Sequence, residues 1–317
     1  MRAVVAAAHP LLFPGHPKGL LLLIRYMNRM ASDPSSISGA QSAASGIATL
    51  SAASFAKLAR FTTRELGIKM PDAKLPMIQS RLMRRTRELG FDSLDRYADY
   101  LLDAAAGADE RIHFINAITT NKTDFFREPS HFDYLSAVVL PGFEGGRCFR
   151  AWSAGCSSGE EPYTLAMILS EFAALRGGFD FSILATDIST RVLDRAREAI
   201  YEENLIGPIP APLRARYLLR SKDASRRVVR IAPELRQRVT FERLNFMDAR
   251  YSTGGTLDAI FFRNVMIYFD RNTQEDVINR MCRNLRFGGH LFVGHSESLA
   301  GLDVPLDAIG PALYRKC

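Results

Sequence analysis

The chain has 317 residues, of which 47% are hydrophobic and 24% charged, the balance of a soluble globular protein with one or two domains. Its four cysteines lie far apart without C-x-x-C spacing, so we predict neither a zinc site nor a disulfide framework, and a reducing, cytoplasmic setting fits best. The net charge of +7 and the pI of about 9.4 favour an acidic partner, which could be nucleic acid, an anionic membrane or an acidic protein surface.

Residues 1–54 differ in composition from the rest of the chain. The apolar run in "GLLLLIRYM" is too short to span a bilayer, and no later transmembrane segment is visible. A signal peptide is one interpretation of this run, although no clean cleavage pattern follows it. The Ser/Ala/Gly-rich residues 31–54 favour a flexible low-complexity leader, or a true start at Met27 or Met30.

Residues 55–128 have helical periodicity and no strand signals, which predicts a helical N-terminal domain and a linker. Four apolar residues share one face of a predicted helix: Leu75, Ile78, Leu82 and Leu89. Four basic residues lie on its other side or its flank: Lys74, Arg81, Arg84 and Arg87. This basic surface is either a solvated helix face or a docking face for an acidic partner.

From Arg147 onward, strand and helix patterns alternate. Strands are predicted at "RCFRAWSAG", "FDFSILATD", "LDAIFFRN" and "HLFVGH", and helices after Pro162, at "TRVLDRAREAIY" and at "TQEDVINRMCRNL". This alternation predicts an α/β fold with a doubly wound, mostly parallel sheet in residues 129–317. Residues 204–241 break the pattern with prolines and short β-like pieces such as "RRVVRIA", so we predict an inserted antiparallel β-subdomain there.

Three strand ends carry polar residues, and ligands of such sheets bind beyond the carboxyl ends of the strands. The first end is the loop "GCSSGEE", where Gly155 lets the backbone approach a ligand closely and two carboxylates follow. The other ends carry Asp187, suited to a ribose diol, and Asn245, suited to an adenine edge. Because the loop has no P-loop lysine and its acids would repel phosphate, the three ends together predict a pocket for a positively charged nucleoside such as S-adenosylmethionine.

Two further segments are candidates for the same site. "TTNKTDFFRE" contains Asn121, Thr123 and Arg127 beside two phenylalanines, and is either a pinned linker or a lid that directs Arg127 into the cleft. "RNVMIYF" directly follows a predicted strand and contributes Arg263, Asn264 and Tyr268.

At these residues the sequence resembles the CheR-type chemotaxis methyltransferases, which methylate receptor glutamates with S-adenosylmethionine and release S-adenosylhomocysteine. The matching stretches are "ITTNKTDFFRE", "WSAGCSSGEEPYTLAM", "ATDIS", "FRNVMIYFD" and "GHSES", in that order. The similarity covers residues 55–315, and it implies a class I S-adenosylmethionine-dependent methyltransferase fold and a monomer.

The resemblance also implies residue roles. The residues implied to surround the cofactor are Asn121, Thr123, Arg127, Glu161, Asp187, Asn245, Phe246, Arg263 and Asn264. Arg127 and Tyr268 would lie near the transferred methyl group, and the basic helix would face the cytoplasmic helical domain of a chemoreceptor. In some members the β insertion binds a receptor C-terminal peptide through a glycine-containing loop. Here that loop reads "RSKDASRR", so the sequence does not favour tethering.

The implied reaction is in-line attack of a glutamate carboxylate on the sulfonium methyl. Since such a carboxylate has a pKa of about 4.3, no general base is required. Three rival functions stay open: a nucleic-acid methyltransferase, a non-catalytic cofactor-binding module and a small-molecule carboxyl methyltransferase. The absence of an Asn/Asp-Pro-Pro-Tyr motif disfavours the first, and Arg127 with Tyr268 disfavours the second. A small-molecule carboxyl methyltransferase would leave the basic helical domain without a role.

Overall fold

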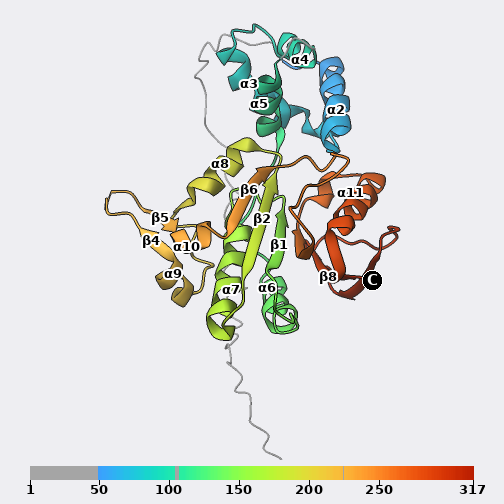
Figure 1. Ribbon diagram of the computed structural model, residues 1–317. Coiled ribbons are helices and arrows are strands. Elements are labelled where there is room, and N and C mark those ends of the chain that lie inside the picture. The colour runs from blue at the N-terminus through green and yellow to red at the C-terminus, as the bar shows by residue number, and fades with distance from the viewer. Residues whose placement is uncertain (1–48, 104–106, 224) are drawn as a thin grey trace, which may run out of the picture. The chain divides into compact units, whose positions relative to one another are not determined.

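The computed structural model describes residues 49–103, 107–223 and 225–317 (Figure 1). Most of the predicted leader therefore lies outside the described residues. Residues 51–54, predicted as part of the leader, form the N-cap and the start of the first described helix. Leu50 is buried, and the Ser51 hydroxyl accepts a hydrogen bond from the Ser54 amide at 3.2 Å.

A helical domain follows, with its own hydrophobic core. Its elements are α2 (Ala52–Leu66), η1 (Asp72–Lys74), α3 (Leu75–Glu88), α4 (Leu94–Leu102) and α5 (Ala108–Ile118). Ile78 and Leu82 of the predicted apolar face are buried in this core, whereas Leu89 caps the end of α3 and is exposed. In the sequence, α6 (Ser130–Tyr134) and the π-helical turn η2 (Leu135–Val139) follow the helical domain, and both pack against the large sheet.

The large sheet has seven strands in the order β6-β2-β1-β7-β8-β10-β9. Their bounds are β1 (Phe149–Ala154), β2 (Phe181–Asp187), β6 (Val239–Arg243), β7 (Leu257–Phe262), β8 (Leu285–Val293), β9 (Leu306–Gly310) and β10 (Leu313–Lys316). The first five strands of that order pair in parallel, and β10 is antiparallel to both of its neighbours. The predicted doubly wound, mostly parallel sheet is confirmed.

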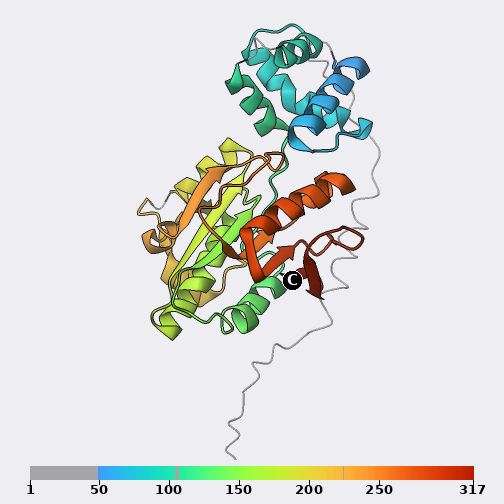
Figure 2. The same ribbon diagram turned by 45° about the vertical axis from the view of Figure 1, so that its right-hand side comes forward.

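Alternation along the strands separates two cores. In β1, Phe149 and Ala151 pack with α6, α7 (Glu160–Arg176) and α8 (Thr190–Glu198), whereas Trp152 and Ala154 pack with α11 (Arg271–Asn284). Figures 1 and 2 accordingly show α7 and α11 on opposite faces of the sheet. Helices on both faces bury the parallel strands and leave their carboxyl ends as the open edge.

A small antiparallel sheet is inserted between α8 and β6, as predicted. It consists of β3 (Ile200–Glu202), β5 (Val228–Ile231) and β4 (Leu218–Arg220), with the short helices α9 (Ala211–Tyr217) and α10 (Pro233–Arg236). Its boundaries differ from the predicted 204–241: the sheet begins at Ile200, which ends α8 early, and residues 239–243 form a strand of the large sheet. Among the described residues, no helix has the length and apolar character needed to cross a membrane.

Candidate active site at the carboxyl edge of the sheet

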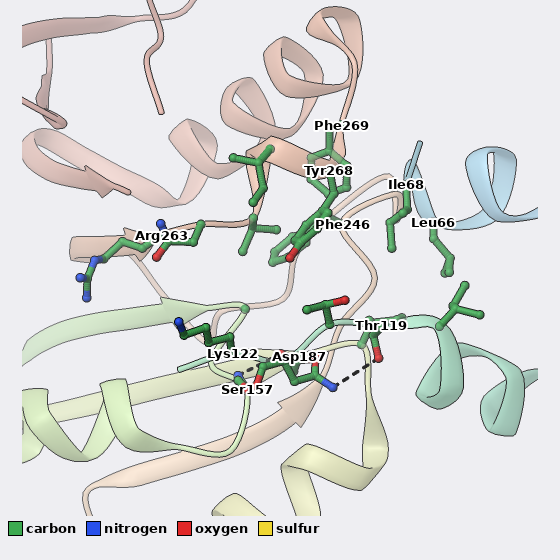
Figure 3. Close-up of a pocket in the computed structure, with 18 of the residues that line it drawn as sticks. Leu66, Ile68, Thr119, Lys122, Ser157, Asp187, Phe246, Arg263, Tyr268 and Phe269 are labelled. Atoms are coloured by element: carbon green, nitrogen blue, oxygen red, sulfur yellow. Dashed lines mark hydrogen bonds between the residues drawn. The ribbon is translucent and has the colours of Figure 1, made fainter. Parts of the chain in front are cut away.

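A cavity of about 450 Å³ lies at the carboxyl ends of β1, β2, β6 and β7, where the helical domain and the linker close over the sheet. In Figure 3, Asp187 and Ser157 face Phe246 and Tyr268 across it. Its apolar lining residues are Leu66, Ile68, Met70, Met77, Ile118, Ile188, Phe246, Val265, Ile267 and Phe269. A mostly apolar cavity of this size with a few polar groups suits a nucleoside-sized ligand.

Asp187 is the most firmly held acid in the cavity. Its Oδ2 accepts a hydrogen bond from the Ser157 amide at 3.0 Å, and its Oδ1 accepts one from the Ser189 amide at 2.9 Å. Burial raises the pKa of Asp187, while these backbone donors oppose the rise. Each oxygen keeps a further lone pair, so the carboxylate can accept two hydroxyl groups of a ligand.

The loop after β1 brings its backbone close to the next strand end. Gly155 has φ +86°, and a Cβ placed there would lie 2.6 Å from Cγ2 of Val265. Only glycine meets both conditions without strain. Glycine is therefore required here by the packing of the loop against Val265, and the predicted approach to a ligand stays a prediction.

A buried guanidinium connects the sheet to the linker. Arg263, whose side chain is only 2% exposed, donates to Glu161 Oε2 at 2.9 Å and to Glu128 Oε2 at 3.1 Å. It also donates to the backbone carbonyl of Arg127. Glu161 is held in turn by the Ser153 hydroxyl at 2.7 Å. These bonds fix the position of the linker next to the cavity.

The two carboxylates of this network have opposite pKa shifts. Burial raises the pKa of Glu161, and Arg263 only partly offsets it. Burial acts in the same direction on Glu128, but the charge and hydrogen bonds of Arg263 outweigh it, so its pKa is lowered. Glu128 also accepts from the Asn264 side chain at 3.3 Å. It is therefore the more firmly ionised of the two acids.

Unusual backbone conformations gather around this network. Four residues other than glycine have positive φ values there: Phe126, Glu128, Ser157 and Asn264. Such conformations cost energy and persist only where the surroundings impose them, as they often do at functional sites. Phe125 anchors the linker below them, being buried against Tyr201 with ring centroids 4.9 Å apart.

Asn245 lines the cavity and also binds other parts of the protein. Its side-chain amide donates to the Glu65 carbonyl at 2.7 Å and accepts from the Met247 amide at 3.1 Å. The side chain thus joins the helical domain to the strand end, and only one donor hydrogen and one lone pair remain for a ligand.

Most predicted site residues meet at the cavity. Those that line it are Asn121, Arg127, Gly155, Asp187, Asn245, Phe246, Arg263, Asn264 and Tyr268. Thr123 and Glu161 do not line it, and Glu161 acts on it only through Arg263. The sequence analysis missed Lys122, which lines the cavity, and Glu128, which holds Arg263. Both lie in the segment "TTNKTDFFRE", so their nearness to Arg127 in the sequence was the signal that could have identified them.

The four basic residues predicted to form a docking face lie in different surroundings. Arg81 donates to the carbonyls of Ala117, Ile118 and Thr119 at 3.0–3.3 Å, so it ties α3 to the end of α5. Lys74 lines the cavity instead of the outer surface. Arg84 and Arg87 remain exposed, as predicted.

The donor set fits S-adenosylmethionine. Asp187 offers acceptors for ribose hydroxyls, Phe246 and Ile188 offer apolar surface for a base, and Lys122 offers donors for the amino-acid carboxylate. A nucleoside-sized cavity at the carboxyl ends of the parallel strands lies where a sheet of this type binds a nucleoside-containing cofactor.

Comparison with known proteins gives the family. Residues 121–310 match the model described as CheR methyltransferase, SAM binding domain, and residues 53–119 match CheR methyltransferase, all-alpha domain. The chain therefore belongs to the CheR methyltransferase family, and S-adenosylmethionine is its cofactor.

Known relatives are similar in sequence to this chain along most of their length. The chain is 39% identical to the chemotaxis protein methyltransferase of Borreliella burgdorferi, over 82% of this chain and 93% of that protein. It is 42% identical to chemotaxis protein methyltransferase 2 of Pseudomonas aeruginosa, over 79% of this chain and 88% of that protein. Among solved structures, PKMT2 from Rickettsia typhi is 14% identical with a TM-score of 0.34, covering 55% of this chain and 26% of that one.

Proposed function

We propose that the protein transfers a methyl group from S-adenosylmethionine to glutamate side chains in the cytoplasmic helical domain of chemoreceptors, forming glutamyl methyl esters. The observation that carries this proposal is the cavity itself, in which Asp187 lies opposite Tyr268 while Arg127 lines the same space. Membership in a family of chemotaxis methyltransferases supports the receptor as substrate.

The nucleophile requires orientation and no activation. A glutamate carboxylate is ionised at neutral pH, and the bound cofactor supplies an electrophilic methyl group on its sulfonium. The protein supplies alignment, which can be worth about 7–11 kcal/mol of the barrier.

Arg127 is placed to hold the incoming carboxylate. Its NH1 donates to the Lys122 carbonyl at 3.0 Å, and its Nε lies 3.9 Å from Glu128 Oε1. The guanidinium therefore keeps donors free for a charge-assisted bond to the substrate. Because its side chain is 31% exposed, it can meet a carboxylate arriving from solvent.

Tyr268 supplies a neutral donor beside this position. Burial raises the pKa of Tyr268, so the hydroxyl stays protonated at neutral pH. Lys74 lies over its ring, with Nζ 5.8 Å from the ring centroid. Together with Lys122 and Arg127, Lys74 gives the cavity a positive wall that attracts an anionic side chain.

Residues around the cavity would each contact a different part of S-adenosylmethionine. Asp187 would accept the ribose hydroxyls, Phe246 would pack on the base, and Asn121 would contact the amino-acid portion. Arg263 and Asn264 would complete the cavity wall, with Glu161 positioning Arg263. Thr123 was also predicted to bind the cofactor, but it lies outside the cavity lining.

The rival functions have less support. The relatives are named as chemotaxis methyltransferases, which does not favour a nucleic-acid substrate. A module that only bound the cofactor would not require a positive wall facing an open cavity. A small-molecule carboxylate would not require the exposed arginines Arg84 and Arg87 on α3.

The test is incubation with methyl-labelled S-adenosylmethionine and chemoreceptor-containing membranes, followed by mild alkali and capture of volatile methanol. Base-labile label on the receptor is expected, and alkali-stable label would contradict ester formation. Arg127→Ala should keep cofactor binding measurable by calorimetry while lowering transfer by about a hundredfold or more. Arg96→Ala, which alters an exposed ion pair on α4, is the matched control and should transfer normally. Normal transfer by Arg127→Ala would overturn the role of that residue.

A further inference from the structure

Three metal-ligating side chains meet beside the buried network but outside the cavity lining. Glu128 comes from the linker, His131 from α6 and His295 from the loop after β8. One ligand atom from each lies within 4.8 Å of the others. The two imidazole rings have centroids 4.8 Å apart, and Nδ1 of His131 is 3.6 Å from Glu128 Oε2.

Hydrogen bonding does not account for the burial of the His131 ring. It is 3% exposed, and neither of its ring nitrogens has a hydrogen-bond partner among the described residues. Burying an imidazole in this way removes a donor and an acceptor from water, and no hydrogen bond offsets that cost. A neutral imidazole offers a nitrogen lone pair to a metal ion.

We propose that Glu128, His131 and His295 form a binding site for a divalent transition-metal ion such as Zn²⁺, Co²⁺ or Ni²⁺. Two imidazole nitrogens and one carboxylate oxygen form a ligand set that binds these ions in preference to Mg²⁺ and Ca²⁺. His295 is exposed, which gives an entry path and leaves room for water as a further ligand. The Ser130 hydroxyl, 3.1 Å from His295 Nε2, helps to orient that ring.

The surrounding charges limit the affinity. Arg263 donates to Glu128 Oε2 at 3.1 Å, and Arg127 Nε lies 3.9 Å from its other oxygen, so two guanidinium groups oppose an added cation. We therefore expect a dissociation constant of roughly micromolar order, weaker than that of a structural zinc site.

Metal binding should also affect the active site. An ion on Glu128 competes with the bonds from Arg263 and Asn264, which line the cavity. The site would thus be inhibitory, a consequence that rests on the proposed function, whereas metal binding itself does not.

The test measures binding directly on the full chain. Co²⁺ is added to metal-free protein, and bound metal is measured by equilibrium dialysis and by the visible absorption of the ion. One ion per chain with nitrogen and oxygen ligation is expected. His295→Ala should lower the affinity about tenfold or more, because one ligand is lost while the fold is little affected at an exposed position.

The matched control is His113→Ala, which removes an exposed histidine from α5, away from the cluster. It should bind Co²⁺ as the unaltered chain does. Equal affinity of the His295→Ala and His113→Ala variants would overturn the site, as would a thiolate-to-cobalt charge-transfer band that assigned the ion to a cysteine. Glu128→Gln is the second variant and should weaken binding without removing a histidine. Failure of methyl transfer with intact Co²⁺ binding would refute the proposed function alone.

Discussion

Removing the Glu161 carboxylate should destabilise the protein through Arg263, whose side chain is 2% exposed. In Glu161→Ala, NH1 of Arg263 loses its acceptor at 2.9 Å. Breaking a buried ion pair by deleting one partner typically costs about 3–5 kcal/mol. Arg263 keeps Glu128 and the Arg127 carbonyl, so we expect a loss somewhat below that range, about 2–3 kcal/mol of unfolding free energy.

Glu161→Gln should behave differently from the alanine variant. Glutamine keeps the volume and an acceptor for Arg263, and it removes a charge whose burial is unfavourable, as the raised pKa of Glu161 indicates. The two effects oppose each other, so we expect a change below about 1 kcal/mol.

Urea unfolding followed by circular dichroism measures both variants, with Asp194→Ala as an exposed ion-pair control that should change stability by less than about 0.5 kcal/mol. The reasoning would be refuted if Glu161→Ala were as stable as this control. It would also be refuted if the glutamine variant lost as much stability as the alanine variant.

Three further predictions concern the cavity and its scaffold. Asp187→Ala should weaken S-adenosylhomocysteine binding by about ten- to a hundredfold in calorimetry, because hydrogen bonds to a charged acceptor are worth about 1.5–3 kcal/mol; unchanged affinity would exclude it from ribose recognition. Gly155→Ala should lower the melting temperature through about 1–3 kcal/mol of strain, since the new Cβ would lie 2.6 Å from Val265 at φ +86°; a normal melting temperature would mean that the loop adapts freely. His290 has a pKa of about 4 because it is buried, so the unfolded chain takes up its proton first and stability falls as the pH drops from 6.5 towards 4. His290→Gln should reduce that slope by up to about 1.4 kcal/mol per pH unit in urea titrations, and an unchanged slope would contradict the assignment.

The sheet and the position of the site could be predicted because both follow from chain-local patterns. Continuous apolar runs identified β1, β2 and β7, and parallel pairing then placed Gly155, Asp187 and Asn245 at one edge. Boundaries were less predictable where one element runs into another. Ala199 ends α8 with φ +55°, and the next residue already pairs in the small sheet, although "REAIY" continues the helical pattern.

Side-chain partners were the part that sequence could not supply. Asn245 was expected to face a ligand, yet its amide meets Glu65 on a helix far away in the chain. Arg81 was expected to face solvent, yet three carbonyl oxygens at the end of α5 accept from it. In both cases the deciding partner is a backbone carbonyl, which every residue carries and no sequence pattern marks.

The adjacent acids Glu160 and Glu161 illustrate the same limit at the active site. Both open α7, yet Glu160 is bonded by the Ser158 hydroxyl at 2.8 Å, whereas Glu161 turns to Arg263. Consecutive helical residues point about 100° apart, so only one of two neighbouring carboxylates can face the strand end. Which one does so depends on the register between α7 and β7, and this is set by packing. The family resemblance named Glu161 as a residue near the cofactor, and the geometry shows that its direct partner is a guanidinium.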